Sequence, residues 1–132
     1  MSTPTLVINC MDKRLQFWIF LFMLFHRLLG RAYLYSVAGG ASLCSHGHEE
    51  FDRAFGLTVR HGVSPVILCA HETCAATKDQ GFKTLADERN FHVGELRRVK
   101  SLVLDANSKA VVRMYYWRRV FGRDWWWRPE KI

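Results

Sequence analysis

The chain of 132 residues is long enough to bury a core without disulfide bonds, and we expect one domain over residues 1–132. With 49% hydrophobic and 23% charged residues, the composition excludes a disordered chain. The formal net charge of +7 favours an anionic ligand or nucleic acid as a partner, but it carries no information about the fold.

The N-terminus and the longest apolar run bear on the location of the protein. Residues 1–9 carry no charged region before an apolar one, so we expect no signal peptide and a cytoplasmic protein. The apolar run 17–25 is far shorter than the roughly 20 residues of a membrane span, so we expect no membrane insertion. The four cysteines are therefore interpreted as ligands or buried thiols and not as a disulfide framework.

The first predicted elements are a strand over 5–10, a helix over 15–29 and a strand over 33–37. The helix contains more aromatic residues than one small core requires, so we expect part of it to pack against another subunit. The second strand ends in Gly39 and Gly40, and two glycines at a strand end let the backbone approach a neighbour or a ligand closely.

The second half of the chain continues the alternation of strands and helices. This rhythm predicts βαβ units, and hence an α/β fold with a mainly parallel four-stranded sheet, flanking helices and a short antiparallel edge strand. The expected elements are a helix over 49–61, a buried strand over 66–70, a loop with a short helix over 75–87, a helix capped by Asp87 or Asn90, a strand over 110–117 and the edge strand over 125–127.

Three soft metal ligands follow strand ends. Cys10 ends the first strand, and His71 and Cys74 follow the central one at a spacing that lets both side chains reach one ion. If these strands are neighbours in a parallel sheet, the three ligands converge at one edge. Two cysteines and one histidine leave a tetrahedral zinc ion with one open position, as in catalytic zinc sites. The alternative is a buried thiol at each cysteine and a capping histidine.

A thiol at a helix N-terminus loses its proton more easily, which we expect to favour metal binding by Cys74. Asp12 and Arg14 should project to the same side of the chain as Cys10, since side chains of an extended segment alternate. Asp12 is then placed to accept the proton or hydrogen bond of a zinc-bound water, with Arg14 holding it by a bidentate contact. Alternatively, Asp12 is the fourth zinc ligand, or the two residues form a structural ion pair.

Three blocks, residues 10–14, 38–40 and 71–74, resemble the β-class carbonic anhydrases in order and spacing. The resemblance implies that Cys10, His71 and Cys74 bind Zn²⁺ and that Asp12 and Arg14 form the catalytic dyad. It also implies reversible hydration of CO2 to bicarbonate and an active site at the interface of a homodimer or larger homo-oligomer. We further predict that Gly39 and Gly40 contact the substrate.

The chain departs from that family at residues 36–37, where Ser-Val replaces the usual Arg-Asn, and it is shorter than typical members. These departures motivate an alternative: a catalytically degenerate zinc-binding protein that uses its basic, Trp/Arg-rich C-terminal end to bind a partner or nucleic acid. A twisted edge hairpin is the favoured interpretation of that end. Remaining residues are assigned simpler roles: Cys69 and His92 in the core, Glu88 and Glu95 on a solvated face, Cys44 in a loop, and His46 and His48 at a helix entry.

Overall fold

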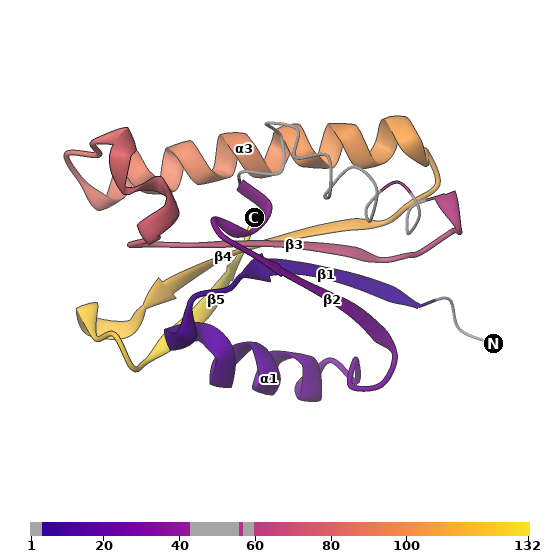
Figure 1. The fold of residues 1–132 in the computed structure, drawn as a ribbon, viewed down its shortest axis with the longest axis horizontal. Helices are drawn as coiled ribbons and strands as arrows, with labels where there is room; N and C mark the ends of the chain where they lie inside the picture. The colour runs from indigo at the N-terminus through magenta and orange to yellow at the C-terminus, as the bar shows by residue number, and fades with distance from the viewer. Residues whose placement is uncertain (1–3, 43–55, 57–59) are drawn as a thin grey trace.

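The computed structural model describes residues 4–42, 56 and 60–132 (Figure 1). Within them the chain forms a five-stranded sheet of order β2-β1-β3-β4-β5. Four strands are parallel and β5 runs antiparallel to β4, which confirms the predicted α/β sheet with its antiparallel edge. The strands are β1 (Thr5–Cys10), β2 (Ala32–Val37), β3 (Val66–His71), β4 (Val112–Arg119) and β5 (Trp127–Lys131).

Two of the three inner strands, β1 and β3, are buried along their whole length. Each is a run of mostly apolar residues, as expected for parallel strands that are covered on both faces. They pair in the register Leu6 with Val66 and Ile8 with Leu68. Because neighbouring parallel strands end at the same edge, Cys10 and His71 come to lie on that edge.

Helices cover the two faces of the sheet, with α3 on one side and α1 on the other (Figure 1). The α1 side buries Leu15, Ile19 and Phe22 against Val7 and Ile67. The α3 side buries a second apolar cluster that includes Leu96, Val99, Val103, Leu6 and Leu68. The helices are η1 (Lys13–Leu15), α1 (Gln16–Phe25), η3 (Ala75–Gln80), α3 (Leu85–Ala106) and η4 (Val120–Gly122).

The helix boundaries differ from the expected ones in two places. The helix predicted over 15–29 ends at Phe25, because Arg27 adopts a left-handed φ of 56° that cannot continue it. The cap of α3 is Thr84 and not Asp87 or Asn90: its side chain accepts a hydrogen bond from the Asp87 amide, so Asp87 lies inside the first turn.

The C-terminal strands also begin later than predicted. The strand predicted over 110–117 is β4, from residue 112, and the edge predicted over 125–127 starts only at Trp127. Residues 125 and 126 belong to the turn, since the Trp126 amide donates to Arg123 O and its carbonyl accepts from Val120 N. The short helix predicted within 75–87 is confirmed as η3.

Buried polar groups on α3 correct one prediction and confirm another. His92 is fully buried, as expected, with its ring nitrogens near Ser42 Oγ and Thr77 Oγ1. Glu88 and Glu95 do not form a solvated face: both are buried. Glu88 accepts the Thr73 amide proton at 2.7 Å, and Arg98 lies 3.7 Å from Glu95, so each carboxylate has a partner that offsets its loss of water.

Other predictions lie outside the described residues. These are the roles of Cys44, His46 and His48 and most of the helix over 49–61. In the described parts of the chain, no helix combines the length and the apolar composition that crossing a bilayer requires.

Candidate metal centre

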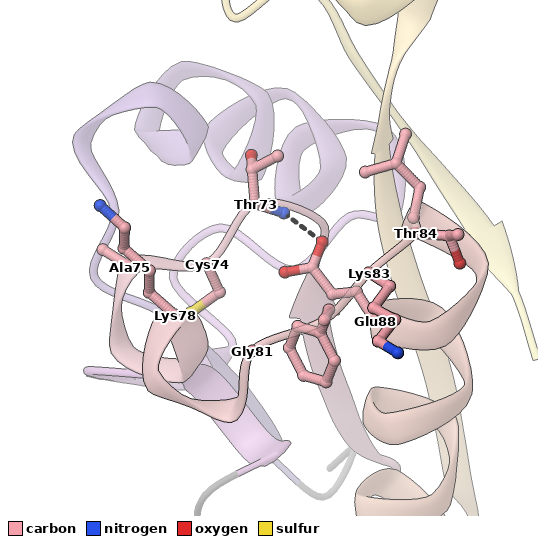
Figure 2. Close-up of a pocket in the computed structure, with 10 residues that line it drawn as sticks. Thr73, Cys74, Ala75, Lys78, Gly81, Lys83, Thr84 and Glu88 are labelled. Atoms are coloured by element: carbon pink, nitrogen blue, oxygen red, sulfur yellow. Dashed lines mark hydrogen bonds between the residues drawn. The ribbon is translucent and has the colours of Figure 1, made fainter.

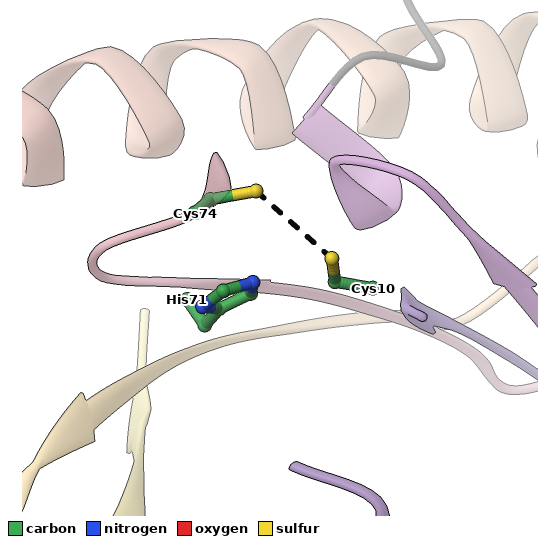
Figure 3. A group of neighbouring side chains, drawn as sticks. All are labelled: Cys10, His71 and Cys74. Atoms are coloured by element: carbon green, nitrogen blue, oxygen red, sulfur yellow. Dashed lines mark hydrogen bonds between the residues drawn. The ribbon is translucent and has the colours of Figure 1, made fainter. Parts of the chain in front are cut away.

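The three predicted ligands meet at the carboxyl edge of the sheet (Figure 3). Cys10 is the last residue of β1, His71 is the last of β3, and Cys74 lies in the turn that precedes η3. All three residues are buried, and their ligand atoms lie within 4.8 Å of one another. The sheet topology therefore brings together side chains that are 64 residues apart in the chain.

The distance between the two sulfur atoms fits a shared tetrahedral ion. Cys10 Sγ and Cys74 Sγ are 3.9 Å apart, and both thiols are free. Two sulfurs on one zinc, each at about 2.3 Å, stand about 3.8 Å apart in a tetrahedral arrangement. A disulfide requires about 2.05 Å. The observed separation matches the first geometry and not the second.

His71 is oriented as a metal ligand. Its Nδ1 lies 2.8 Å from the carbonyl oxygen of Glu72, which can only accept, so Nδ1 carries the proton. The lone pair then resides on Nε2, which is buried and has no hydrogen-bond partner among the described residues. A buried acceptor without a partner is costly, and coordination of a cation relieves that cost. The donor set therefore fits a soft divalent ion such as Zn²⁺.

The two thiols influence each other's protonation. A hydrogen bond from Cys74, with smaller contributions from His71, lowers the pKa of Cys10 to about 4. The same contact raises the pKa of Cys74, as does burial. The contact between the two sulfurs therefore favours loss of one proton from the pair, with the remaining thiol donating to the thiolate. The expected effect of the helix N-terminus on Cys74 stays a prediction. In contrast, burial raises the pKa of Cys69 to about 12, as expected for a core thiol.

Asp12 and Arg14 form a close ion pair beside the three ligands. Arg14 Nη2 donates to Asp12 Oδ2 at 2.7 Å and Nε donates to Oδ1 at 3.1 Å, the bidentate contact that was predicted. Asp12 Oδ1 also accepts the Arg14 amide proton at 2.9 Å and so caps η1. These hydrogen bonds from Arg14 hold the pKa of Asp12 below its usual value, despite partial burial.

The carboxylate lies at the edge of the ligand cluster. Asp12 Oδ2 is 3.9 Å from His71 Nε2, the nitrogen that has no hydrogen-bond partner among the described residues. At this distance Asp12 is too far for a direct hydrogen bond to the imidazole. Asp12 therefore lies close to the candidate ligands without contacting His71 directly.

The glycine pair at the end of β2 lies behind Cys10. Gly39 and Gly40 have φ values of 83° and 58°, in the left-handed region that favours glycine. A Cβ on Gly40 would lie 2.6 Å from the carbonyl oxygen of Cys69 and 2.9 Å from the amide nitrogen of Cys10. Gly40 thus lets the chain pack directly on the backbone of β1 and β3. The predicted contact with substrate stays a prediction.

A pocket of about 560 Å³ opens beside Cys74 (Figure 2). Its wall includes Thr73, whose left-handed φ of 55° directs the amide to Glu88 Oε1 and the carbonyl to Arg14 Nη2. The roles of Thr73 and Glu88 were not predicted, since neither spacing nor composition indicates a contact across 15 residues. The remaining lining residues are Cys74, Ala75, Lys78, Gly81, Phe82, Lys83, Thr84 and Leu85.

Fold and site together define an α/β protein with a buried Cys/His cluster at the carboxyl edge of a parallel sheet, able to hold a metal ion. No protein-family model matches the chain, and no curated protein sequence matches it either.

Solved structures of two other proteins are similar to this chain. The β-carbonic anhydrase isoform I of Trichomonas vaginalis is similar with a TM-score of 0.57 and 14% identity, over 100% of this chain and 85% of that one. A tetrameric β-carbonic anhydrase from Sordaria macrospora gives a TM-score of 0.51 and 14% identity, over 100% and 81%. The chain therefore has a β-carbonic anhydrase-like fold.

Proposed function

We propose that this protein is a zinc-dependent carbonic anhydrase that interconverts CO2 and bicarbonate. The observation that carries the proposal is the buried His71 Nε2, which has no hydrogen-bond partner in the described part of the chain and lies close to two free thiols and 3.9 Å from Asp12. The β-carbonic anhydrase-like fold supports it. Thiolates and imidazoles are the ligands that zinc prefers in proteins, so this cluster favours chemistry at a metal.

In this proposal Cys10, His71 and Cys74 hold Zn²⁺. When bound, the ion acts as a Lewis acid that lowers the pKa of water towards 7 and so supplies a nucleophile at neutral pH. All three ligands are buried, which limits the contact of the bound ion with solvent, while the pocket beside Cys74 would give access for a small molecule. Glu72 O fixes the tautomer of His71 and thereby keeps Nε2 free to coordinate.

Asp12 and Arg14 act as the catalytic dyad of the proposal. Arg14 keeps Asp12 ionised, so its carboxylate accepts a hydrogen bond and does not donate one. Because Arg14 Nε and Nη2 hold both oxygens of Asp12, the carboxylate has one orientation toward His71 Nε2. An oriented acceptor aligns a reacting water for attack on CO2. If Asp12 itself were to coordinate the metal, it would fill the fourth ligand position and leave none for water.

We extend the proposal to the remaining predicted roles. The backbone at Gly39 and Gly40, packed behind Cys10, supplies the substrate contact. The protein forms a homodimer or larger homo-oligomer, which the exposed aromatic face of α1 supports: Phe17, Phe20 and Phe25 are each more than half exposed. Exposed apolar patches of this kind mark interaction surfaces.

The test is stopped-flow CO2 hydration on zinc-loaded protein, with wild type and Asp12→Ala compared at equal zinc content. We expect wild type to hydrate CO2 and the variant to lose about 10²- to 10⁴-fold in kcat, the usual contribution of a positioned proton acceptor. Asp105→Asn is the matched control, since Asp105 lies on the exposed end of α3 far along the chain from the site. Equal rates for wild type and Asp12→Ala would refute the catalytic role.

The alternative, partner or nucleic-acid binding by the C-terminal end, is supported only in part by the side chains there: Trp125 and Trp126 are exposed and stacked on each other. Trp117 and Trp127 are buried, and so cannot stack on bases. Arg118 lies 3.5 Å from Glu130, and Arg119 donates to Glu72 at 3.0 Å, so both charges already have partners. We therefore favour the enzyme.

A further inference from the structure

Trp127, the first residue of β5, directly follows the turn between β4 and β5 and contacts the candidate site. Trp127 is only 1% exposed. Its ring contacts the His71 ring edge-on, with centroids 5.6 Å apart and planes at 79°. The Arg14 guanidinium lies over the same indole at 5.3 Å from the centroid. One side chain from the C-terminal hairpin thus touches a candidate ligand and a member of the candidate dyad.

Asp124 connects this turn to Arg14 directly. Asp124 Oδ1 accepts from Arg14 Nη1 at 3.0 Å and from Arg119 Nη1 at 3.3 Å. Its backbone carbonyl accepts from Trp127 Nε1 at 2.7 Å. The same residue therefore binds two guanidinium groups with its side chain and orients the indole with its main chain.

Arg119 ties the turn to the end of β3. The carboxylate of Glu72, the residue after His71, is buried and accepts from the Arg119 amide at 2.9 Å and from its Nε at 3.0 Å. Glu72, Arg119, Asp124 and Arg14 thus form a continuous chain of charge-assisted hydrogen bonds that ends at Asp12.

We propose that Asp124 is a positioning residue for the Asp12–Arg14 dyad and that the β4–β5 turn is a part of the active site. The expected effect of Asp124 on CO2 hydration rests on the proposed function. The contact between Asp124 and Arg14 rests on the geometry of the structure alone. Arg14 presents its Nε and Nη2 edge to Asp12, while Nη1 points to Asp124. Asp124 is the shorter of two contacts to Nη1, the other being Thr73 Oγ1 at 3.4 Å, and it limits rotation of the guanidinium away from Asp12.

The charge of Asp124 matters as well as its hydrogen bonds. Arg14 and Arg119 both bind Oδ1 of Asp124, so their two positive charges face one carboxylate. If an amide replaces that carboxylate, the two guanidinium groups repel each other with no intervening negative charge. Because Arg119 is anchored by the more deeply buried Glu72, we expect Arg14 to shift against its contacts with Asp12 and Thr73.

A positioning role is separable from a stabilising one. The Asp124 side chain is 63% exposed, and ion pairs at such positions contribute little to stability. The fold should therefore survive the loss of the charge, whereas the orientation of Arg14 should not. Misplacement of a catalytic group by a fraction of an ångström is enough to slow a reaction.

The experiment compares Asp124→Asn with wild type, with Asp105→Asn as the matched surface control. We expect unchanged zinc per chain, an unchanged unfolding midpoint, and kcat for CO2 hydration about tenfold lower with little change in KM. The NMR signal of the Arg14 Nε proton, assigned by its absence in Arg14→Lys, should broaden in Asp124→Asn. Asp124→Glu, which keeps the charge, should recover the signal and part of kcat.

The proposal is overturned if Asp124→Asn keeps the wild-type Arg14 signal, whatever happens to turnover, because Asp124 would then not position Arg14. It is overturned equally if the signal broadens while kcat stays at the wild-type value. If wild type shows no CO2 hydration, the proposed function fails, and the Arg14 signal still decides whether Asp124 holds the guanidinium.

Discussion

The two halves of the candidate site are held in different ways. The ligand cluster of Cys10, His71 and Cys74 is buried and lies on or just after the ends of adjacent strands. The dyad of Asp12 and Arg14 is partly exposed and rests on hydrogen bonds from several segments. Backbone topology positions the first half, and side-chain contacts position the second. Changes in the cluster should therefore affect metal binding and stability, and changes around the dyad should affect turnover.

The largest effect should come from breaking the cluster. We expect Cys74→Ser to lose stoichiometric zinc and all CO2 hydration above background, since a serine hydroxyl is a poor ligand for zinc at neutral pH. Because metal binding contributes to folding, a chelator should lower the unfolding midpoint of wild type and leave that of the variant unchanged. Metal analysis and thermal unfolding with and without chelator measure both.

Cys69→Ala is the matched control for this substitution. Cys69 is equally buried but lies outside the cluster, so the variant should keep its zinc and lose only about 1 kcal/mol of stability through the small cavity. Zinc loss in both variants would show that packing, and not ligation, explains the result.

A smaller effect should follow from disturbing the backbone behind the cluster. Gly40→Ala should lower the free energy of unfolding by about 2–4 kcal/mol, from the positive φ and from the 2.6 Å contact of its Cβ with Cys69 O. Gly30→Ala shares the positive φ but meets nothing within 4 Å, so it should cost only about 1 kcal/mol. Urea unfolding of the two variants gives the difference, and equal costs would mean that close packing at Gly40 is unimportant.

The smallest effect concerns the dyad and its pH dependence. Arg14 holds the folded-state pKa of Asp12 below 3.8, so the pair contributes stability above about pH 4 that is lost as the pH falls through the depressed value. In Arg14→Gln this contribution disappears, and the gap in urea midpoint between wild type and variant should narrow from pH 6 to pH 3. Because the pair is partly exposed, the change should be modest. If the difference in urea midpoint between wild type and Arg14→Gln widens as the pH falls, Arg14 does not lower the pKa of Asp12.

Much of the fold follows from local patterns. The ends of β1 and β3 were predicted within a residue of the observed ones, because buried parallel strands are short apolar runs with clear stops. The predicted boundaries of helices and strands were wrong where a particular contact decided them. Examples are the Thr84 cap of α3 and the turn that includes Trp126. The solvated face assigned to Glu88 was wrong because its partner, the Thr73 amide, is brought there by the tertiary fold.

The ligand set could be inferred from residue types and strand ends alone, because a parallel sheet collects the carboxyl ends of its strands at one edge. The residues that surround the three candidate ligands could be identified only from the folded molecule. Asp124 lies 110 residues from Arg14, and no periodicity or motif reports a contact over that distance. Trp127 likewise meets His71 only because β5 folds back on β4. The residue types and spacing of candidate ligands can be identified from the sequence. The contacts that hold a site in place come from long-range packing, which only the complete fold creates.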